Sequence, residues 1–71
     1  MKKQEWLEEY RRLAGDLMSK ASKAESYAKN QDPDQLAGDS DFARLQDDVS
    51  AAGKSLEEFW KKFHSGQIKL D

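Results

Sequence analysis

Hydrophobic residues recur at helical spacing on both sides of a central break in this chain. In the first part they fall three or four positions apart, at Trp6, Tyr10, Leu13, Leu17, Ala21, Ala24 and Ala28. Residues spaced in this way share one face of an α-helix. Leu7 and Ala14 widen the face to roughly 120°, which is typical of a helix that packs against a core. The pattern predicts a helix over about residues 3–29.

The second part of the chain has an even stricter pattern. Steps of three and four residues alternate without exception through Phe42, Leu45, Val49, Ala52, Leu56, Phe59 and Phe63. A sustained seven-residue repeat is typical of a coiled-coil seam. Asp39 or Ser40 can cap the start of this helix, and Gly66 suits its end. We therefore predict a helix over about residues 40–65 and a tail over 66–71.

The connector between the two patterns carries its own helix signal. Asp32 suits an N-cap, Pro33 suits the first helical position, and Gln35 can complete a capping box with Asp32. Gly38 then predicts a stop. We expect a single helical turn at about residues 33–37.

Matched residue sizes on the two long stripes predict how they meet. If the chain folds back at residues 33–37, facing residues have numbers that sum to about 69, so that Trp6 lies near Phe63 and Ala28 near Phe42. Large residues then face small ones near the turn, which is how facing layers fill space at native density. The sequence predicts an all-α fold, an antiparallel helical hairpin that forms one domain over residues 1–71.

A hairpin of two helices buries little surface on its own. We expect it to pair with a second copy into a four-helix bundle, to dock on a partner, or to be closed by its connector and tail. Leu7, Ala14 and Met18 lie to one side of the seam and are the natural second interface.

Aromatic residues gather at the end where the two termini meet. They are Trp6, Tyr10, Phe59, Trp60 and Phe63, and Trp60 lies at the edge of the seam. One interpretation is that these rings plug the open end of the hairpin. The other is that Trp6, Tyr10, Trp60 and Phe63, together with Leu7 and Met18, anchor a partner, since Trp and Tyr dominate binding hot spots. Both interpretations can hold in part.

Composition narrows the classes of function. The chain has no Cys and one His, so we expect no catalytic centre, no metal site and no cofactor. It has no Thr, and Val49 and Ile68 are its only β-branched residues, which agrees with an all-α fold. No apolar run is long enough to cross a bilayer. Because Met1-Lys2-Lys3 is followed by Gln4-Glu5 rather than by an apolar run, we expect a cytoplasmic protein.

Charge is divided along the chain. Residues 31–50 hold six acidic residues against Arg44 alone. Four of the acids flank the turn and form an acidic tip, Asp32, Asp34, Asp39 and Asp41. These acids suit the starts of helices, and a tip of this charge also suits a basic partner surface.

These features lead to an expectation about function. We expect a non-catalytic protein–protein interaction module, a small adaptor or inhibitor such as bacterial or phage genes encode, with a protein partner, a second copy of itself, or both. The alternative is a coiled coil whose only task is oligomerisation or scaffolding. A weaker alternative is a dimeric hairpin that binds RNA or DNA through Lys20, Lys23 and Lys29, although the net charge of −2 disfavours nucleic acid.

Overall fold

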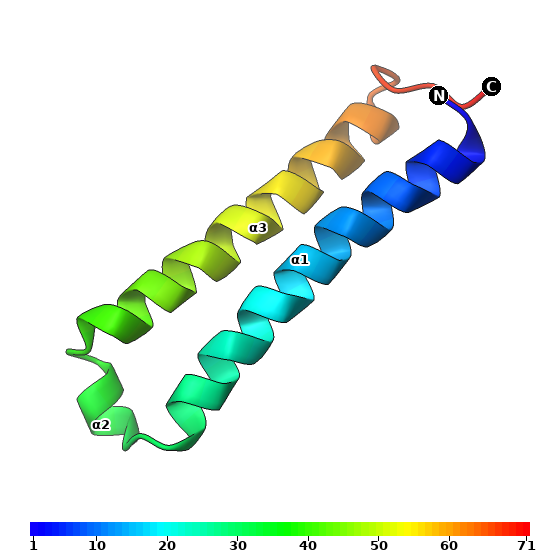
Figure 1. The fold of residues 1–71 in the computed structure, drawn as a ribbon. Helices are drawn as coiled ribbons and strands as arrows, with labels where there is room; N and C mark the ends of the chain where they lie inside the picture. The colour runs from blue at the N-terminus through cyan, green and yellow to red at the C-terminus, as the bar shows by residue number, and fades with distance from the viewer.

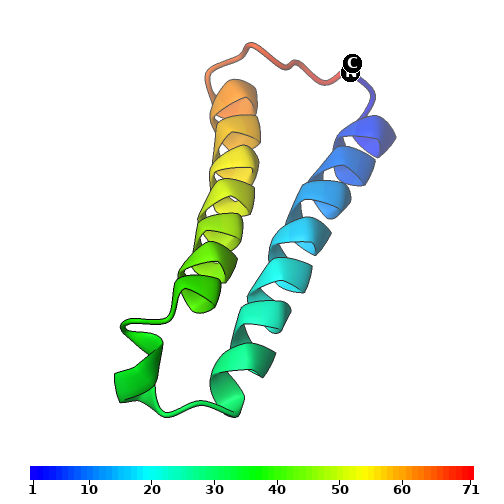
Figure 2. The same cartoon turned by 60° about the vertical axis from the view of Figure 1, so that its left-hand side comes forward.

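The computed structural model describes residues 1–71 as three helices and no strand. Helix α1 spans Lys3–Lys29, α2 spans Pro33–Leu36 and α3 spans Ser40–His64. The helices α1 and α3 run antiparallel side by side, α2 lies in the connector, and both termini lie at the opposite end (Figure 1; Figure 2). The molecule is a rod of 50 × 19 × 13 Å. The predicted all-α helical hairpin is confirmed.

The helix starts follow from local capping. Asp39 is the N-cap of α3, and its carboxylate accepts hydrogen bonds from the backbone N–H groups of Asp41 and Phe42 at 2.9 and 3.1 Å. Asp32 is the N-cap of α2, with Pro33 at the first helical position as predicted. Its carboxylate accepts from the backbone of Asp34, and the predicted capping box with Gln35 does not form. These bonds satisfy N–H groups that have no partner within a helix.

The end of α3 turns the chain back toward α1. The helix ends at His64, one residue before the expected boundary, and Gly66 adopts a left-handed conformation with φ of 87°. Glycine adopts this conformation with little steric strain because it has no Cβ atom. The backbone N–H of Gly66 donates to the Phe63 carbonyl, and that of Ile68 to the Lys62 carbonyl, at 3.2 and 3.1 Å. The turn thereby places Ile68, half-buried, against the hairpin.

The tail then runs across to the start of α1. The backbone N–H of Asp71 donates to the Met1 carbonyl at 3.0 Å, and the Met1 nitrogen donates to the Lys69 carbonyl at 2.9 Å. These two bonds tie the tail across the open end of the hairpin, where the views show the termini together (Figure 2).

The core is a thin seam between α1 and α3. Only Ala24, Ala52 and Phe59 are buried, and the other seam residues are half-buried or exposed. The predicted register holds at both ends, because Trp6 packs on Phe63 with ring centroids 5.1 Å apart and Tyr27 stacks on Phe42 at 6.2 Å. Midway, a methyl group of Leu17 lies 4.0 Å from where a Gly53 side chain would begin. The small residues of the seam bring the helices close but leave much of it open to solvent.

Candidate partner-binding surface

Trp6 is the centre of the aromatic cluster at the open end. Its ring is stacked on Tyr10 with centroids 5.3 Å apart, and it contacts Phe59 and Phe63 at 5.7 and 5.1 Å. Such pairs add to the stability gained from burial. Phe59 is 8% exposed and Trp6 is half-buried, so this part of the cluster plugs the end of the hairpin. The Trp6 indole N–H is itself buried and has no hydrogen-bond partner.

Trp60 belongs to the cluster but lies largely outside the seam. Its ring contacts Phe63 and stacks on His64, each with centroids 5.8 Å apart, yet 49% of the residue is exposed. Tyr10 is 39% exposed. The structure therefore brings Trp6, Tyr10, Trp60 and Phe63 together as expected. Trp6 and Phe63 turn inward, whereas Tyr10 and Trp60 reach the surface.

A groove lies between the exposed rings. It has a volume of about 430 Å³ and is lined by Trp6, Tyr10, Gly53, Leu56, Glu57 and Trp60. Glu57 is its one charged residue. The Lys61 ammonium lies 2.9 Å from the Glu57 carboxylate, and this hydrogen bond lowers the pKa of Glu57 and raises that of Lys61. The groove is thus an apolar trough with an ion pair along one edge.

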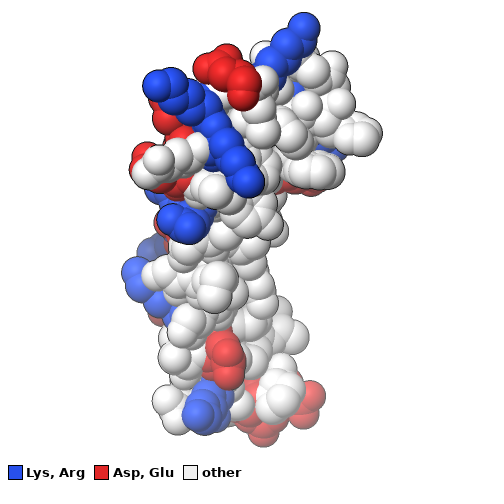
Figure 3. All heavy atoms as spheres, turned by 90° about the vertical axis from the view of Figure 1, so that its right-hand side faces the viewer, with Lys and Arg blue, Asp and Glu red and all other residues white.

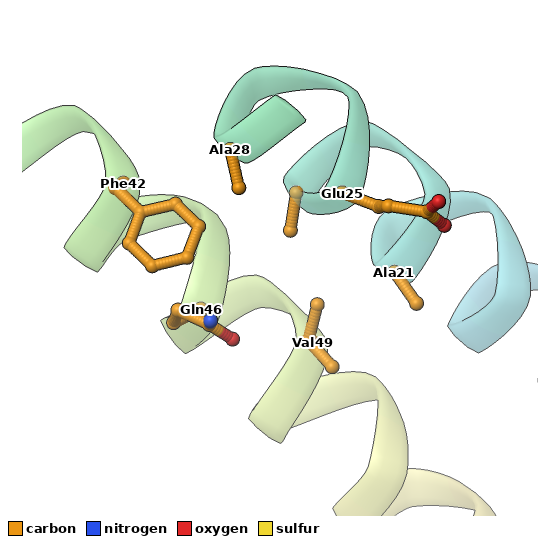
Figure 4. Close-up of a pocket in the computed structure, with 7 residues that line it drawn as sticks. Ala21, Glu25, Ala28, Phe42, Gln46 and Val49 are labelled. Carbon is orange, nitrogen blue, oxygen red and sulfur yellow. The ribbon is translucent and has the colours of Figure 1, made fainter. Parts of the chain in front are cut away.

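A second hollow of about 300 Å³ lies nearer the turn. Figure 4 shows alanine side chains of α1 across from Phe42 and Val49 of α3. The lining residues are Ala21, Ala24, Glu25, Ala28, Phe42, Gln46 and Val49. We refer to it as the alanine hollow.

The groove and the alanine hollow lie on the same side of the hairpin. On α3, Gln46, Gly53 and Trp60 are seven residues apart and therefore share a face. On α1, the neighbouring face carries Leu7, Ala14, Met18, Ala21 and Glu25, spaced by the same rule. Leu7 and Ala14 are half-buried, whereas Met18 is 70% exposed. We call this surface, defined by these eight residues, the grooved side.

The opposite side of the hairpin has a different chemistry. Its hollow, of about 280 Å³, is lined mainly by polar and charged groups, Glu9, Arg12, Ser55, Glu58 and Lys62, around Leu13, Phe59 and Ile68. Arg12 donates to the Glu9 carboxylate, which lowers the pKa of Glu9. On the face shown in Figure 3, uncharged atoms run along most of the molecule, and Lys and Arg atoms lie mainly along the left edge, with others at the upper and lower ends. Of these two sides, the grooved side is the more apolar.

The hairpin exposes more surface than its mass requires. Its accessible surface is 5562 Å², whereas a compact monomer of its 8.1 kDa has about 4,500 Å². Isolated exposed apolar residues are ordinary on a monomer, but a contiguous apolar strip marks an interaction site. The excess of accessible surface, about 1,000 Å², arises because the seam between the helices is thin. It is consistent with a side of the hairpin that no other surface covers.

The acidic tip is largely a capping structure. Asp32 and Asp39 accept backbone hydrogen bonds at the starts of α2 and α3, and Asp34 and Asp41 lie exposed in the first turns of those helices. Asp and Glu atoms are visible at the lower end in Figure 3, where Figure 1 places α2. Two of the four carboxylates are thus engaged, and two are free to face a partner.

Tyr27 lies off the hydrophobic stripe of α1, so the pattern of the sequence did not predict its role. Its hydroxyl donates to the Asp39 carboxylate, a bond that raises the pKa of Tyr27 to about 12 and lowers that of Asp39. The sequence did carry a signal for these contacts. Positions 27 and 42 sum to 69, the register of the hairpin, and Phe42 follows the N-cap residue Asp39 by three positions.

Comparison with known proteins adds no assignment. No protein-family model, curated protein or solved structure matches the chain. The structure contains no cluster of three or more His, Cys, Asp or Glu side chains placed to hold a metal ion. None of its helices combines the length and the hydrophobicity that a membrane crossing demands.

Proposed function

We propose that the protein is a non-catalytic protein–protein interaction module, a small adaptor or inhibitor, that acts by laying its grooved side on the surface of another protein molecule. The same side also serves self-association of the hairpin into a four-helix bundle. The observation that carries the proposal is the position of Trp60, which is 49% exposed beside an apolar groove of about 430 Å³.

Exposed aromatic and methionine side chains suit this role for a physical reason. A Trp ring buries a large area while few torsions are fixed, so its burial at an interface gains more free energy than the loss of its freedom costs. Met18 is flexible and polarisable, and it adapts to an irregular partner surface. The charged groups of the opposite side would instead lose hydration on burial.

The alternative is a structural coiled coil that only oligomerises or scaffolds. The seven-residue repeat of α3 favours it, because such repeats recur wherever helices associate along their length. A scaffold uses self-contacts alone, whereas an adaptor or inhibitor also contacts a different protein. The two functions therefore differ in what covers the grooved side.

The experiment that separates them is photo-crosslinking in the cells that produce the protein. A photoreactive phenylalanine derivative is placed at Met18, on the grooved side, and in a control at Glu8, which is exposed on the outer face of α1. The Met18 probe is expected to yield a product larger than twice the 8.1 kDa of one chain, and the Glu8 probe is not.

The outcomes are distinct. A larger product that also disappears in a Trp60→Ala background supports the adaptor or inhibitor. A product of twice the chain mass alone supports the scaffold instead. No product from Met18, with the variant folded by circular dichroism, contradicts both.

A further inference from the structure

We infer that a second copy of this chain binds the grooved side, in an antiparallel two-fold dimer in which Trp60 of each hairpin packs into the alanine hollow of the other. The inference rests on the proposed function, since it names an occupant of the same side, and adds the orientation and the contact that define the complex.

The exposed area agrees with what a stable dimer needs. A specific interface of standard size buries about 800 Å² on each partner. The hairpin exposes 5562 Å², about 1,000 Å² more than a compact monomer of its mass. One dimer contact along the grooved side would therefore remove most of the surplus. Because the other side is charged, association stops at two copies instead of continuing into a filament.

The two-fold arrangement follows from positions along the hairpin. By the register in which facing residues sum to about 69, Trp60 lies level with residue 9 of α1, and the alanine hollow spans the level of residues 21–28. The midpoint between them is the level of Leu17 and its neighbour Gly53. A two-fold axis at that level places Trp60 of one copy against the alanine hollow of the other. Within one hairpin, Trp60 and the middle of the hollow lie about 23 Å apart along the rod, at 1.5 Å per residue.

The surfaces at these positions are complementary in shape. A bulky ring that protrudes at one end meets a hollow floored by alanines at the other, and the symmetry makes the contact twice. At the axis, Gly53 and Ala14 are small enough to let the two hairpins approach closely, and Met18 fills the remaining space beside them. The axis also falls at the middle of α1, so that the full length of each rod is used.

Charge favours antiparallel over parallel association. The open half of the hairpin, residues 1–15 and 54–71, has eight basic and six acidic residues, whereas the turn half, residues 16–53, has four basic and eight acidic ones. An antiparallel dimer places a half with net charge +2 beside one with −4 at both ends. A parallel dimer places the two acidic halves together, which like-charge repulsion disfavours.

The test measures mass and orientation together. Light scattering behind a sizing column gives the mass of the full chain from low to high micromolar concentration. Because the chain has no Cys, one spin label can be attached through Asp34→Cys at the exposed turn. Antiparallel copies place the two labels at opposite ends, at a separation close to the 50 Å length of the rod. Parallel copies place them within about half that length.

Two variants test the contact itself. Trp60→Ala removes the protruding ring, and Ala21→Trp fills the hollow from within the same chain. Each is expected to raise the dimer dissociation constant at least tenfold, as loss of a hot-spot contact does. Ser26→Trp is the matched control, because Ser26 is exposed and does not line the hollow, and it should leave the constant within about twofold. Circular dichroism verifies that each variant remains helical.

The results separate this inference from the proposed function. A dimer with long label distances that both variants weaken supports the inference. A monomer throughout, a short label distance, or a dimer that neither folded variant weakens overturns it. A Met18 crosslink to a larger protein would still support the proposed function in each of these three cases.

Discussion

The Tyr27 hydroxyl donates a hydrogen bond to the Asp39 carboxylate, 2.5 Å away, and so joins the last turns of α1 to the first residue before α3. The same carboxylate accepts the backbone N–H groups of Asp41 and Phe42, and the Tyr27 ring stacks on Phe42. One side chain therefore caps a helix and fastens it to its neighbour. This arrangement holds the turn end of the hairpin, where the facing residues of α1 are alanines and offer little area for packing.

Removal of the Tyr27 hydroxyl should loosen the turn. We expect Tyr27→Phe to lower the thermal unfolding midpoint, because the Asp39 carboxylate loses a donor while the ring remains to stack on Phe42. Circular dichroism at a fixed protein concentration measures the change. Tyr10→Phe is the control, since the Tyr10 hydroxyl makes no hydrogen bond in the structure, and an equal loss in both variants would contradict the role of the Tyr27–Asp39 bond.

The same bond predicts a pH window for stability. The bond raises the pKa of Tyr27 from 10.0 to about 12 and lowers the pKa of Asp39 below 3.8. Its contribution is therefore complete between about pH 4 and pH 10. It is lost at high pH as the solution approaches the raised pKa of Tyr27, and at low pH as it falls through the lowered pKa of Asp39.

Two measurements check this window. The stability difference between the wild type and Tyr27→Phe should be constant from about pH 5 to pH 9 and shrink beyond pH 10 and below pH 4. Tyrosinate absorbance should also show a step near pH 12 in the folded wild type that is missing in Tyr27→Phe. A difference that varies between pH 5 and pH 9 would show that another group is responsible.

Phe59 is the side chain on which the open end depends most. It is the one large residue that is buried, at 8% exposure, and it packs on Trp6. Truncation of a buried Phe to Ala costs about 3–5 kcal/mol, and a domain of this length has a total stability of about 4–11 kcal/mol. Phe59→Ala should therefore unfold a large fraction of the protein or lower its urea midpoint steeply.

A matched surface variant controls for the position of Phe59 on the helix. Glu58→Ala changes the preceding, exposed residue and should stay within about 0.5 kcal/mol of the wild type. Similar midpoints for the two variants would mean that the aromatic plug contributes little to folding.

The sequence pattern predicted the hairpin because each level of it depends on local rules. Helical periodicity placed α1 and α3, Asp32, Pro33 and Asp39 marked helix starts, and Gly66 marked an end. The sizes of facing residues then supplied the register that the Trp6–Phe63 and Tyr27–Phe42 contacts confirm. The capping box at Gln35 did not form because the Gln35 backbone N–H donates to the Asp32 carbonyl, at 2.9 Å, and not to the Asp32 carboxylate.

The candidate surface was only partly accessible to the same reasoning. A stripe shows which residues point inward, but it does not show that Trp6 turns into the seam while Trp60, at its edge, stays half exposed. The groove and the alanine hollow depend on the separation of the two helices, which is a three-dimensional quantity. Tyr27 was missed because it lies off the stripe and its partner is a loop residue, so that no periodicity connects them.

Replacement by alanine should have opposite effects on stability at two of the glycines. Gly15 lies within α1 with nothing within 4 Å of where a side chain would begin, whereas Gly66 has φ of 87°. Gly15→Ala should stabilise the protein by about 0.5–1 kcal/mol, because alanine loses less backbone entropy in a helix. Gly66→Ala should destabilise it by about 1 kcal/mol, because a side chain is strained in the left-handed region.

Thermal unfolding gives a clear reading of this pair. For a chain of this size, 1 kcal/mol moves the midpoint by about 4–8 °C, so Gly15→Ala should raise it by several degrees and Gly66→Ala should lower it by a similar amount. The double variant should lie near the wild type, since the two sites share no contact and their effects add. A fall in the midpoint on Gly15→Ala would mean that the outer face of α1 is covered in solution, where the hairpin leaves it open. The absence of a fall on Gly66→Ala would mean that the tail does not depend on the turn that Gly66 makes.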